Sequence, residues 1–197
     1  MISRVENKSE KDLQDELIAK LREILDSSFV VENGANLYYE LTINNKLELQ
    51  QNPKDPKRGK SAFETDILIS KRNNKLIIPK VVIELKKKLS THDVITYSSK
   101  ALRHKKVYPY LRYGLIIFEE DKIPPRFFIH NEAIDFAVGY KGFDNKRLLL
   151  EMIMKQVYYS DILERKIYGK QKSSFYSLNP QFFDIIKTND NSIKKTS

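Results

Sequence analysis

Two apolar segments of this chain carry charged residues at positions where a buried strand would ordinarily carry none. Residues 63–69 contain Asp66, and residues 81–86 contain Glu84 and Lys86. Because side chains on a strand alternate between its two faces, Glu84 and Lys86 share one face. Charged groups are seldom buried without a partner. A divalent cation bound by Asp66 and Glu84, with Lys86 beside it, is one arrangement that supplies such partners.

The spacing of these residues resembles the signature of the PD-(D/E)xK nuclease superfamily. Asp66 matches the first acid of that motif and Glu84-Leu85-Lys86 matches its second half, whereas Thr65 replaces the leading proline. The resemblance covers roughly residues 9–118. It implies an α/β fold with a restriction-endonuclease-like core, in which a mixed central β-sheet is flanked by helices. It also implies Mg²⁺-dependent hydrolysis of phosphodiester bonds in double-stranded DNA.

The same resemblance gives each motif residue a role. Asp66, Glu84 and the main-chain carbonyl of Leu85 would bind Mg²⁺, which prefers oxygen ligands, and Mn²⁺ would be able to replace it. Lys86 would orient the attacking water or lower its pKa, and would offset negative charge on the phosphate. The alternative is a structural salt bridge between Lys86 and Glu84 or Asp66 on an exposed face of the sheet.

A fourth catalytic residue is predicted on the first helix, because family members often add an acid from that helix. Residues 10–25 form an amphipathic pattern whose apolar side chains are Leu13, Leu17, Leu21, Ile24 and Leu25. At about 100° per residue, Glu10 lies near the middle of that apolar face, while Glu16 and Glu23 lie off it. We therefore predict that Glu10 joins the site. The alternative is a first-turn glutamate that is stabilised by the helix dipole.

The net charge favours a polyanionic partner such as nucleic acid. The chain has 35 Lys and Arg against 26 Asp and Glu, a formal charge of +9, although a basic surface can also lack a binding role. A basic loop at residues 51–61 is expected to enter a groove of DNA, whereas the stripe of Tyr97, Lys100 and Arg103 on a predicted helix has a solvated face as its alternative. The predicted DNA-binding residues are Lys57, Arg58, Lys60, Lys87, Lys88, Tyr97, Lys100 and Arg103.

Composition excludes several other kinds of chemistry. The chain has no cysteine, which excludes disulfides, thiol catalysis and Cys-ligated zinc. His92, His104 and His130 have no ligand spacing and are interpreted as surface or loop residues. No glycine-rich phosphate loop is present, so we expect no ATP site. Neither a signal peptide nor an apolar run of membrane-spanning length is visible, so a cytoplasmic location is expected.

The pattern along the chain indicates one domain over residues 1–187 and a polar, disordered tail at 188–197. Ser9 and Asp12 are expected to form a capping box before the first helix, and aromatic residues in 175–186 are expected to pack on the domain. A hairpin is predicted at 37–43 and 46–50, around Asn44-Asn45. Further strands are predicted at 29–31, 113–118, 126–130 and 134–138, and helices at 91–106, capped by Ser90 or Thr91, and at 145–165.

Several functions are compatible with these residues. The small size resembles compact type II restriction endonucleases, which commonly act as homodimers on palindromic DNA, and a homodimer is therefore expected. A structure-specific junction or repair nuclease would use the same site. An RNA endonuclease remains a further reading. From a different class, the chain could be a nucleic-acid-binding subunit that keeps the fold without catalysis.

Overall fold

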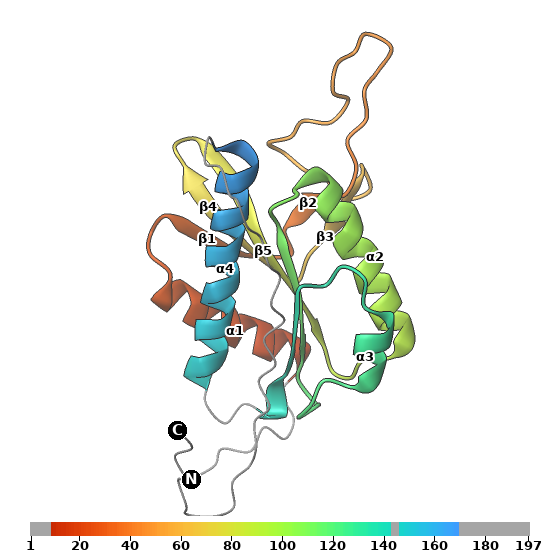
Figure 1. Ribbon diagram of the computed structural model, residues 1–197. Helices are drawn as coiled ribbons and strands as arrows, with labels where there is room; N and C mark the ends of the chain where they lie inside the picture. The colour runs from red at the N-terminus through yellow and green to blue at the C-terminus, as the bar shows by residue number, and fades with distance from the viewer. Residues whose placement is uncertain (1–8, 143–145, 170–197) are drawn as a thin grey trace, which may run out of the picture.

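The computed structural model describes residues 9–142 and 146–169 and contains a mixed five-stranded sheet (Figure 1). β4 is antiparallel to β1 and β5, whereas β5, β6 and β7 run parallel, and the strands lie in the order β1-β4-β5-β6-β7. The predicted α/β class with a mixed central sheet is confirmed. The five strands are β1 (Phe29–Asn33), β4 (Ile67–Asn73), β5 (Leu76–Lys86), β6 (Arg112–Ile117) and β7 (Phe136–Gly139).

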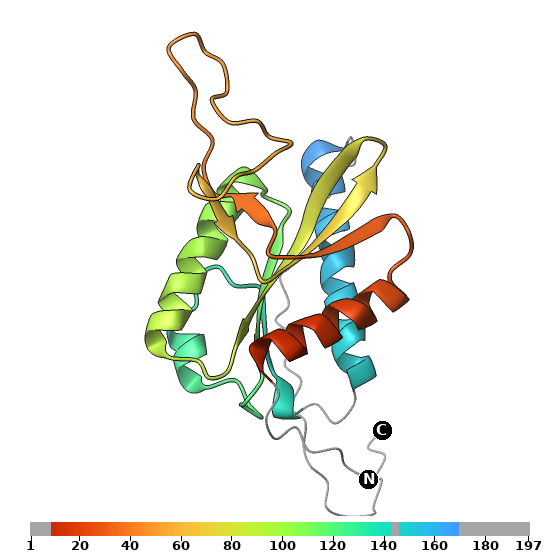
Figure 2. The same cartoon turned by 180° about the vertical axis from the view of Figure 1, so that it is seen from behind.

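Helices cover both faces of this sheet (Figures 1 and 2). The long central strand β5 contributes to both cores: Ile83 and Leu85 pack toward α1 and α4, while Val82 packs toward α2. Alternation along the strand directs Glu84, like Val82, to the α2 face. On one face lie α1 (Glu10–Ile24) and α4 (Lys146–Tyr168), and on the other lie α2 (Thr91–Val107) and the short α3 (Pro125–His130).

Capping boxes begin the two helices that lie nearest the ends of the motif strands. Ser9 and Asp12 bond reciprocally at the start of α1, as predicted, and Ser90 and Asp93 do so at the start of α2. Each box satisfies main-chain N–H groups that the first helical turn would otherwise leave unpaired. Since residues 87–90 alone separate β5 from α2, the box also fixes the start of α2 close to the end of the motif strand.

A long arm leaves the body of the molecule between two short strands (Figures 1 and 2). β2 (Asn36–Tyr38) and β3 (Ala62–Glu64) pair antiparallel. The N–H of Tyr39 donates to the carbonyl of Ser61 at 2.9 Å, which closes the base of the arm, residues 40–60. The predicted hairpin at 37–43 and 46–50 is therefore wrong for residues 37 and 38, but it is correct around Asn44-Asn45, where the N–H of Gln50 donates to the carbonyl of Thr42 and the N–H of Asn44 to that of Glu48, both at 2.9 Å. β2 pairs with β3 on the far side of the arm, and within the arm a single bridge joins Ile43 and Leu49.

Two predicted strands also differ from the structure. Residues 126–130 form helix α3, because Pro125 occupies the first helical turn, where the fixed φ of proline favours a helix. The predicted strand at 63–69 is divided into β3 and β4 by Thr65 and Asp66. This interruption frees Asp66 from the regular ladder, so that its main chain can bond with other parts of the fold.

The face of α1 agrees with the prediction except at one position. Leu13, Leu17 and Leu21 are buried, but Ile24 is 44% exposed and Ile18 takes a place in the core instead. Segments 175–186 and 188–197, for which packing and disorder were predicted, lie outside the described residues. No helix in the described part of the chain is long and apolar enough to cross a membrane.

Candidate functional site

Asp66 lies at the junction of β3 and β4, where several parts of the chain meet. Its carboxylate Oδ2 accepts a hydrogen bond from the main-chain N–H of Leu85 at 2.7 Å. Its carbonyl oxygen accepts from Gln14 Nε2 at 2.5 Å and from the N–H of Gly34 at 3.4 Å. α1, the β1–β2 connection and β5 therefore hold Asp66, and its carboxylate lies against the strand that carries Glu84.

Glu84 is almost fully enclosed, with 2% of its surface exposed. Burial, and then the Asp66 carboxylate, raise the pKa of Glu84 from 4.5 to about 7. The hydroxyl of Tyr113 donates to Glu84 Oε1 at 2.6 Å and opposes this shift. A buried carboxyl group that interacts with a second, half-buried carboxylate is a physical sign of a functional site. Tyr113, from the neighbouring β6, was missed by the sequence interpretation because its only signal is the pairing of two distant strands.

Lys86 makes a contact that the sequence interpretation did not anticipate. Its Nζ lies 5.4 Å from the ring centroid of Tyr97, and a hydrogen bond with that phenol is the main reason that the pKa of Lys86 is raised. The ammonium group therefore stays protonated at neutral pH. Within the described residues Lys86 forms no ion pair with Glu84 or Asp66, so the structural salt bridge considered above does not form.

Tyr97 itself is 8% exposed, which corrects the alternative of a fully solvated stripe on α2. Burial raises its pKa to about 12, so the phenol is neutral and can share its oxygen with the Lys86 ammonium. Further along α2, Lys100 is half-buried and Arg103 is exposed. The stripe thus begins inside the site and ends in solvent.

Glu10 joins the same group of charges from the first turn of α1. Burial and then Asp66 raise the pKa of Glu10, while Lys86 and Lys87 lower it. Such mutual effects require Glu10 to lie near both Asp66 and Lys86, although many residues separate them in sequence. Glu16, by contrast, pairs with Lys20 at 3.3 Å. The structure therefore brings together all four predicted catalytic residues.

The other predicted DNA-binding residues occupy two surfaces. Lys87 and Lys88 are exposed directly after β5. Lys57, Arg58 and Lys60 lie on the arm, where Arg58 pairs with Glu64 at 2.7 Å and Lys57 pairs with Asp55 at 3.3 Å. The pairing of Glu64 with Arg58 directs that acid to the arm.

The oxygen ligands at this site suit a hard cation that takes only a few of its ligands from the protein. In the described residues, no three His, Cys, Asp or Glu side chains are arranged as a ready-made metal cage. Asp66 and Glu84 nevertheless supply two interacting carboxylates, and Mg²⁺ is usually held by one or two carboxylates, with water and substrate oxygens completing its shell. A cation between them would relieve the repulsion that raises the pKa of Glu84.

The histidines contribute nothing to this donor set, and one of them corrects the sequence interpretation. His104 is 0% exposed, not a surface residue, and its Nδ1 lies 2.9 Å from the carbonyl oxygen of Tyr38. Burial lowers its pKa to about 4, so the ring is neutral and donates from Nδ1 to Tyr38. His104 stacks on Tyr113 with ring centroids 5.9 Å apart, and so supports the tyrosine that contacts Glu84.

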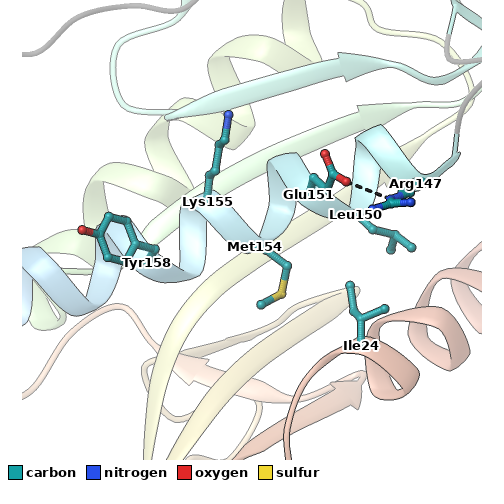
Figure 3. Close-up of a pocket in the computed structure, with 7 residues that line it drawn as sticks. All are labelled: Ile24, Arg147, Leu150, Glu151, Met154, Lys155 and Tyr158. Carbon is teal, nitrogen blue, oxygen red and sulfur yellow. Dashed lines mark hydrogen bonds and ion pairs between the residues drawn. The ribbon is translucent and has the colours of Figure 1, made fainter.

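A pocket of about 510 Å³ lies elsewhere, between α1 and α4 on the opposite side of the sheet (Figure 3). None of the predicted catalytic residues lines it. The residues for which chemistry was predicted therefore lie at the start of β4 and the end of β5 and not in this cavity. Its lining consists of Ile24, Arg147, Leu150, Glu151, Met154, Lys155 and Tyr158.

Thr65 has a structural reason to replace the motif proline. It is 1% exposed, and both its N–H and its hydroxyl donate to the carbonyl of Ala35, at 2.9 and 3.0 Å. Proline can make neither bond, so Thr65→Pro should lower the free energy of unfolding by about 1–3 kcal/mol. Urea unfolding measures the loss. Thr65→Val keeps the N–H and should cost less than Thr65→Pro; equal costs would contradict this explanation.

Comparison with known proteins identifies no family for this chain. No protein-family model matches the chain, and no curated protein matches it either. The resemblance to the PD-(D/E)xK superfamily therefore depends on Asp66, Glu84 and Lys86 and on the surroundings described above.

Proposed function

We propose that this chain is a Mg²⁺-dependent endonuclease of the PD-(D/E)xK type that hydrolyses phosphodiester bonds of double-stranded DNA. The observation that supports the proposal best is the convergence of Glu10, Asp66, Glu84 and Lys86 from α1, the β3–β4 junction and β5. Their charges influence one another's pKa values, as those of a functional cluster do. A purely structural cluster would be expected to end in ion pairs, and in the described residues Lys86 forms none.

Each residue has a definable task in this proposal. Asp66, Glu84 and the Leu85 carbonyl would hold Mg²⁺, which when bound acts as a Lewis acid on the phosphate. Lys86, protonated and held by Tyr97, offsets the charge that develops on the phosphate oxygens. Glu10 adds negative charge beside Lys86 and stabilises its ammonium form.

The substrate class follows from charge. The formal charge of +9 attracts a polyanion, and Lys87 and Lys88 place exposed cations beside the site. A restriction endonuclease that acts as a homodimer is the reading we favour. Junction-specific and RNA-cleaving enzymes would share the site and differ in the shape of nucleic acid that they accept.

Incubation of the chain with supercoiled plasmid and Mg²⁺ tests the proposal. Discrete fragments are expected for a restriction enzyme, whereas nicking or a smear would indicate a structure-specific or nonspecific nuclease. Asp66→Asn is the matched control, since its amide oxygen can still accept from Leu85 while the carboxylate charge is lost. Plasmid left intact under all metal conditions, or cleaved equally by Asp66→Asn, would overturn the proposal.

The role of Glu10 gives a separate prediction. Glu10→Gln should reduce the cleavage rate by about 10–100-fold, the usual cost of losing a partner that supports a metal site. Glu16→Gln, six residues further along α1 and engaged with Lys20, should leave the rate unchanged. Single-turnover cleavage of both variants measures the difference, and equal rates would mean that Glu10 is only a helix-start residue.

A further inference from the structure

Cations and aromatic rings from α2 and from the strands beside it form a line that starts at the candidate site. Lys86 Nζ lies 5.4 Å from the ring centroid of Tyr97. Lys100 Nζ lies 5.0 Å from the centroid of the same ring and 5.5 Å from the ring centroid of Phe63, so it is placed between the two rings. Lys100 also lowers the pKa of Glu84, which places its charge within reach of the carboxylate pair.

The line continues to the base of the arm. Phe63, on β3, stacks on Tyr39 with ring centroids 4.1 Å apart and planes inclined by 21°. The guanidinium carbon of Arg103 lies 5.7 Å from the Tyr39 ring. The stacked pair therefore clasps the two ends of the arm and also holds the last cation. We name the whole line the track: Lys86, Tyr97, Lys100, Phe63, Tyr39 and Arg103.

The charges on the track differ from those on the opposite face of the sheet. There, Lys71, Lys80 and Arg112 also lie over rings, but each is paired with a carboxylate of Asp161 or Asp135 at 2.7–2.8 Å. Across the described residues, by contrast, none of the three track cations takes part in an ion pair.

This difference has a physical meaning. An aromatic ring attracts a cation through its quadrupole but does not cancel the charge, as a carboxylate does. Lys100 and Arg103 are thus held in place while their charges stay available to an external anion. Lysine and arginine arranged in this way beside a phosphodiester site match the contacts that fix a nucleic-acid backbone in register.

The arm extends this surface beyond Arg103 (Figure 1). It carries Lys46, Lys54 and Lys60 in addition to the paired Lys57 and Arg58, against three acids, Glu40, Glu48 and Asp55. Its far end also presents apolar side chains to solvent, among them Leu47 with 86% of its surface exposed. An exposed basic element with an apolar tip suits a groove of nucleic acid, where apolar side chains contact bases.

Building on the proposed nuclease function, we propose that the track is the path of one DNA strand leading away from the cleaved bond. The phosphates of that strand contact Lys100 and then Arg103, and the arm lies in the groove beyond them. Tyr39 and Phe63 position both the cations and the arm. The substrate is thereby bound as a duplex that extends from the site over α2 toward the arm.

A salt series with a short fluorescent DNA duplex in Ca²⁺ tests the phosphate contacts. Lys100→Gln with Arg103→Gln should reduce the slope of log K against log salt by about two, because each phosphate contact contributes about one. Lys75→Gln with Lys166→Gln removes two exposed lysines outside the track and is the matched control, with an unchanged slope expected. Tyr39→Leu should weaken binding several-fold at constant thermal midpoint, and Tyr39→Phe should restore it.

Photocrosslinking tests whether the bound duplex extends from the site toward the arm. A benzophenone side chain introduced at Leu47 on the arm should crosslink to the duplex, whereas one at Leu76, the exposed first residue of β5, should not. Equal salt slopes for the two double variants, or equal crosslinking at the two leucines, would overturn the track even in an enzyme that cleaves plasmid. If the chain binds duplex with these salt slopes and crosslinks but does not cleave it, the proposed DNA path stands and the proposed nuclease function is rejected. Absence of any DNA binding would overturn both.

Discussion

Replacement of Lys86 with alanine should lower the single-turnover cleavage rate by about 100–1,000-fold, the range expected when one preorganised charge is removed from a transition state. The structure argues for this size of effect, because the Lys86 ammonium is kept charged by Tyr97 and Glu10 and makes no ion pair in the described residues. Lys86→Arg should also be slow. The planar guanidinium cannot take the place of a compact ammonium held over the Tyr97 ring.

Lys105 is the matched control for this experiment. It lies on α2, but it bonds to the carbonyl of Ala133 at 2.6 Å and to Asp135 at 2.8 Å, away from the carboxylate pair. Lys105→Ala should therefore lower the thermal midpoint and leave the cleavage rate unchanged, the reverse of Lys86→Ala. Normal cleavage by Lys86→Ala would refute the mechanism.

Replacement of Glu84 with glutamine should stabilise the metal-free protein at alkaline pH while abolishing cleavage. The pKa of Glu84 is about 7 in the folded chain against 4.5 without burial. Below the lower value the side chain is protonated in both states and costs nothing. Between pH 4.5 and about 7 the unfolded chain ionises while the folded chain keeps the proton on Glu84, so the wild-type chain loses about 3 kcal/mol by pH 7 and no more above it.

Thermal unfolding across this pH range measures the effect, with EDTA present to keep the protein free of metal. The midpoint of Glu84→Gln should match that of wild type near pH 4 and exceed it by roughly 5–10 °C above pH 8. Tyr113→Phe removes the hydrogen bond that lowers the pKa of Glu84, so in that variant the pH-dependent loss of stability should extend to higher pH and become larger. Parallel midpoints for wild type and Glu84→Gln would show that Glu84 is not held in the buried state described above.

The elements that carry the site were predictable because their signals are local. The charged residues Asp66, Glu84 and Lys86 interrupt apolar runs, and a box of Ser and Asp precedes each of the helices α1 and α2. Helical periodicity alone selected Glu10 over Glu16, and the structure places Glu10 near Asp66 and Lys86. These features depend on side-chain period and on contacts three or four residues apart, which a sequence displays directly.

The rest of the site depends on contacts between distant segments. Tyr113 reaches Glu84 only because β6 pairs in parallel with β5, and Phe63 meets Tyr39 only because β3 pairs with β2 across the arm. His104 lies among charged residues in the sequence, as a surface histidine would, but it is buried against Tyr113. No local pattern contains such pairings, which is why the predicted pairing of residues 37 and 38 and the surface assignment of His104 were both wrong.

Because the arm is closed at its base by the hydrogen bond between Tyr39 and Ser61, its length can change with little effect on the rest of the fold. Since the main chain enters and leaves the arm at two residues that are hydrogen-bonded to each other, insertions or deletions in its outer part, residues 41–50, need not displace β2, β3 or the carboxylates. Residues 52–58 differ, because Asn52 and Asp55 accept hydrogen bonds from Tyr38 and Arg58 pairs with Glu64. Even a doubled loop costs only about 0.6 kcal/mol of additional closure entropy. The outer part of the arm is therefore a position where the chain can be lengthened, shortened or exchanged for a foreign segment, while the framework that holds Asp66 and Glu84 is kept intact.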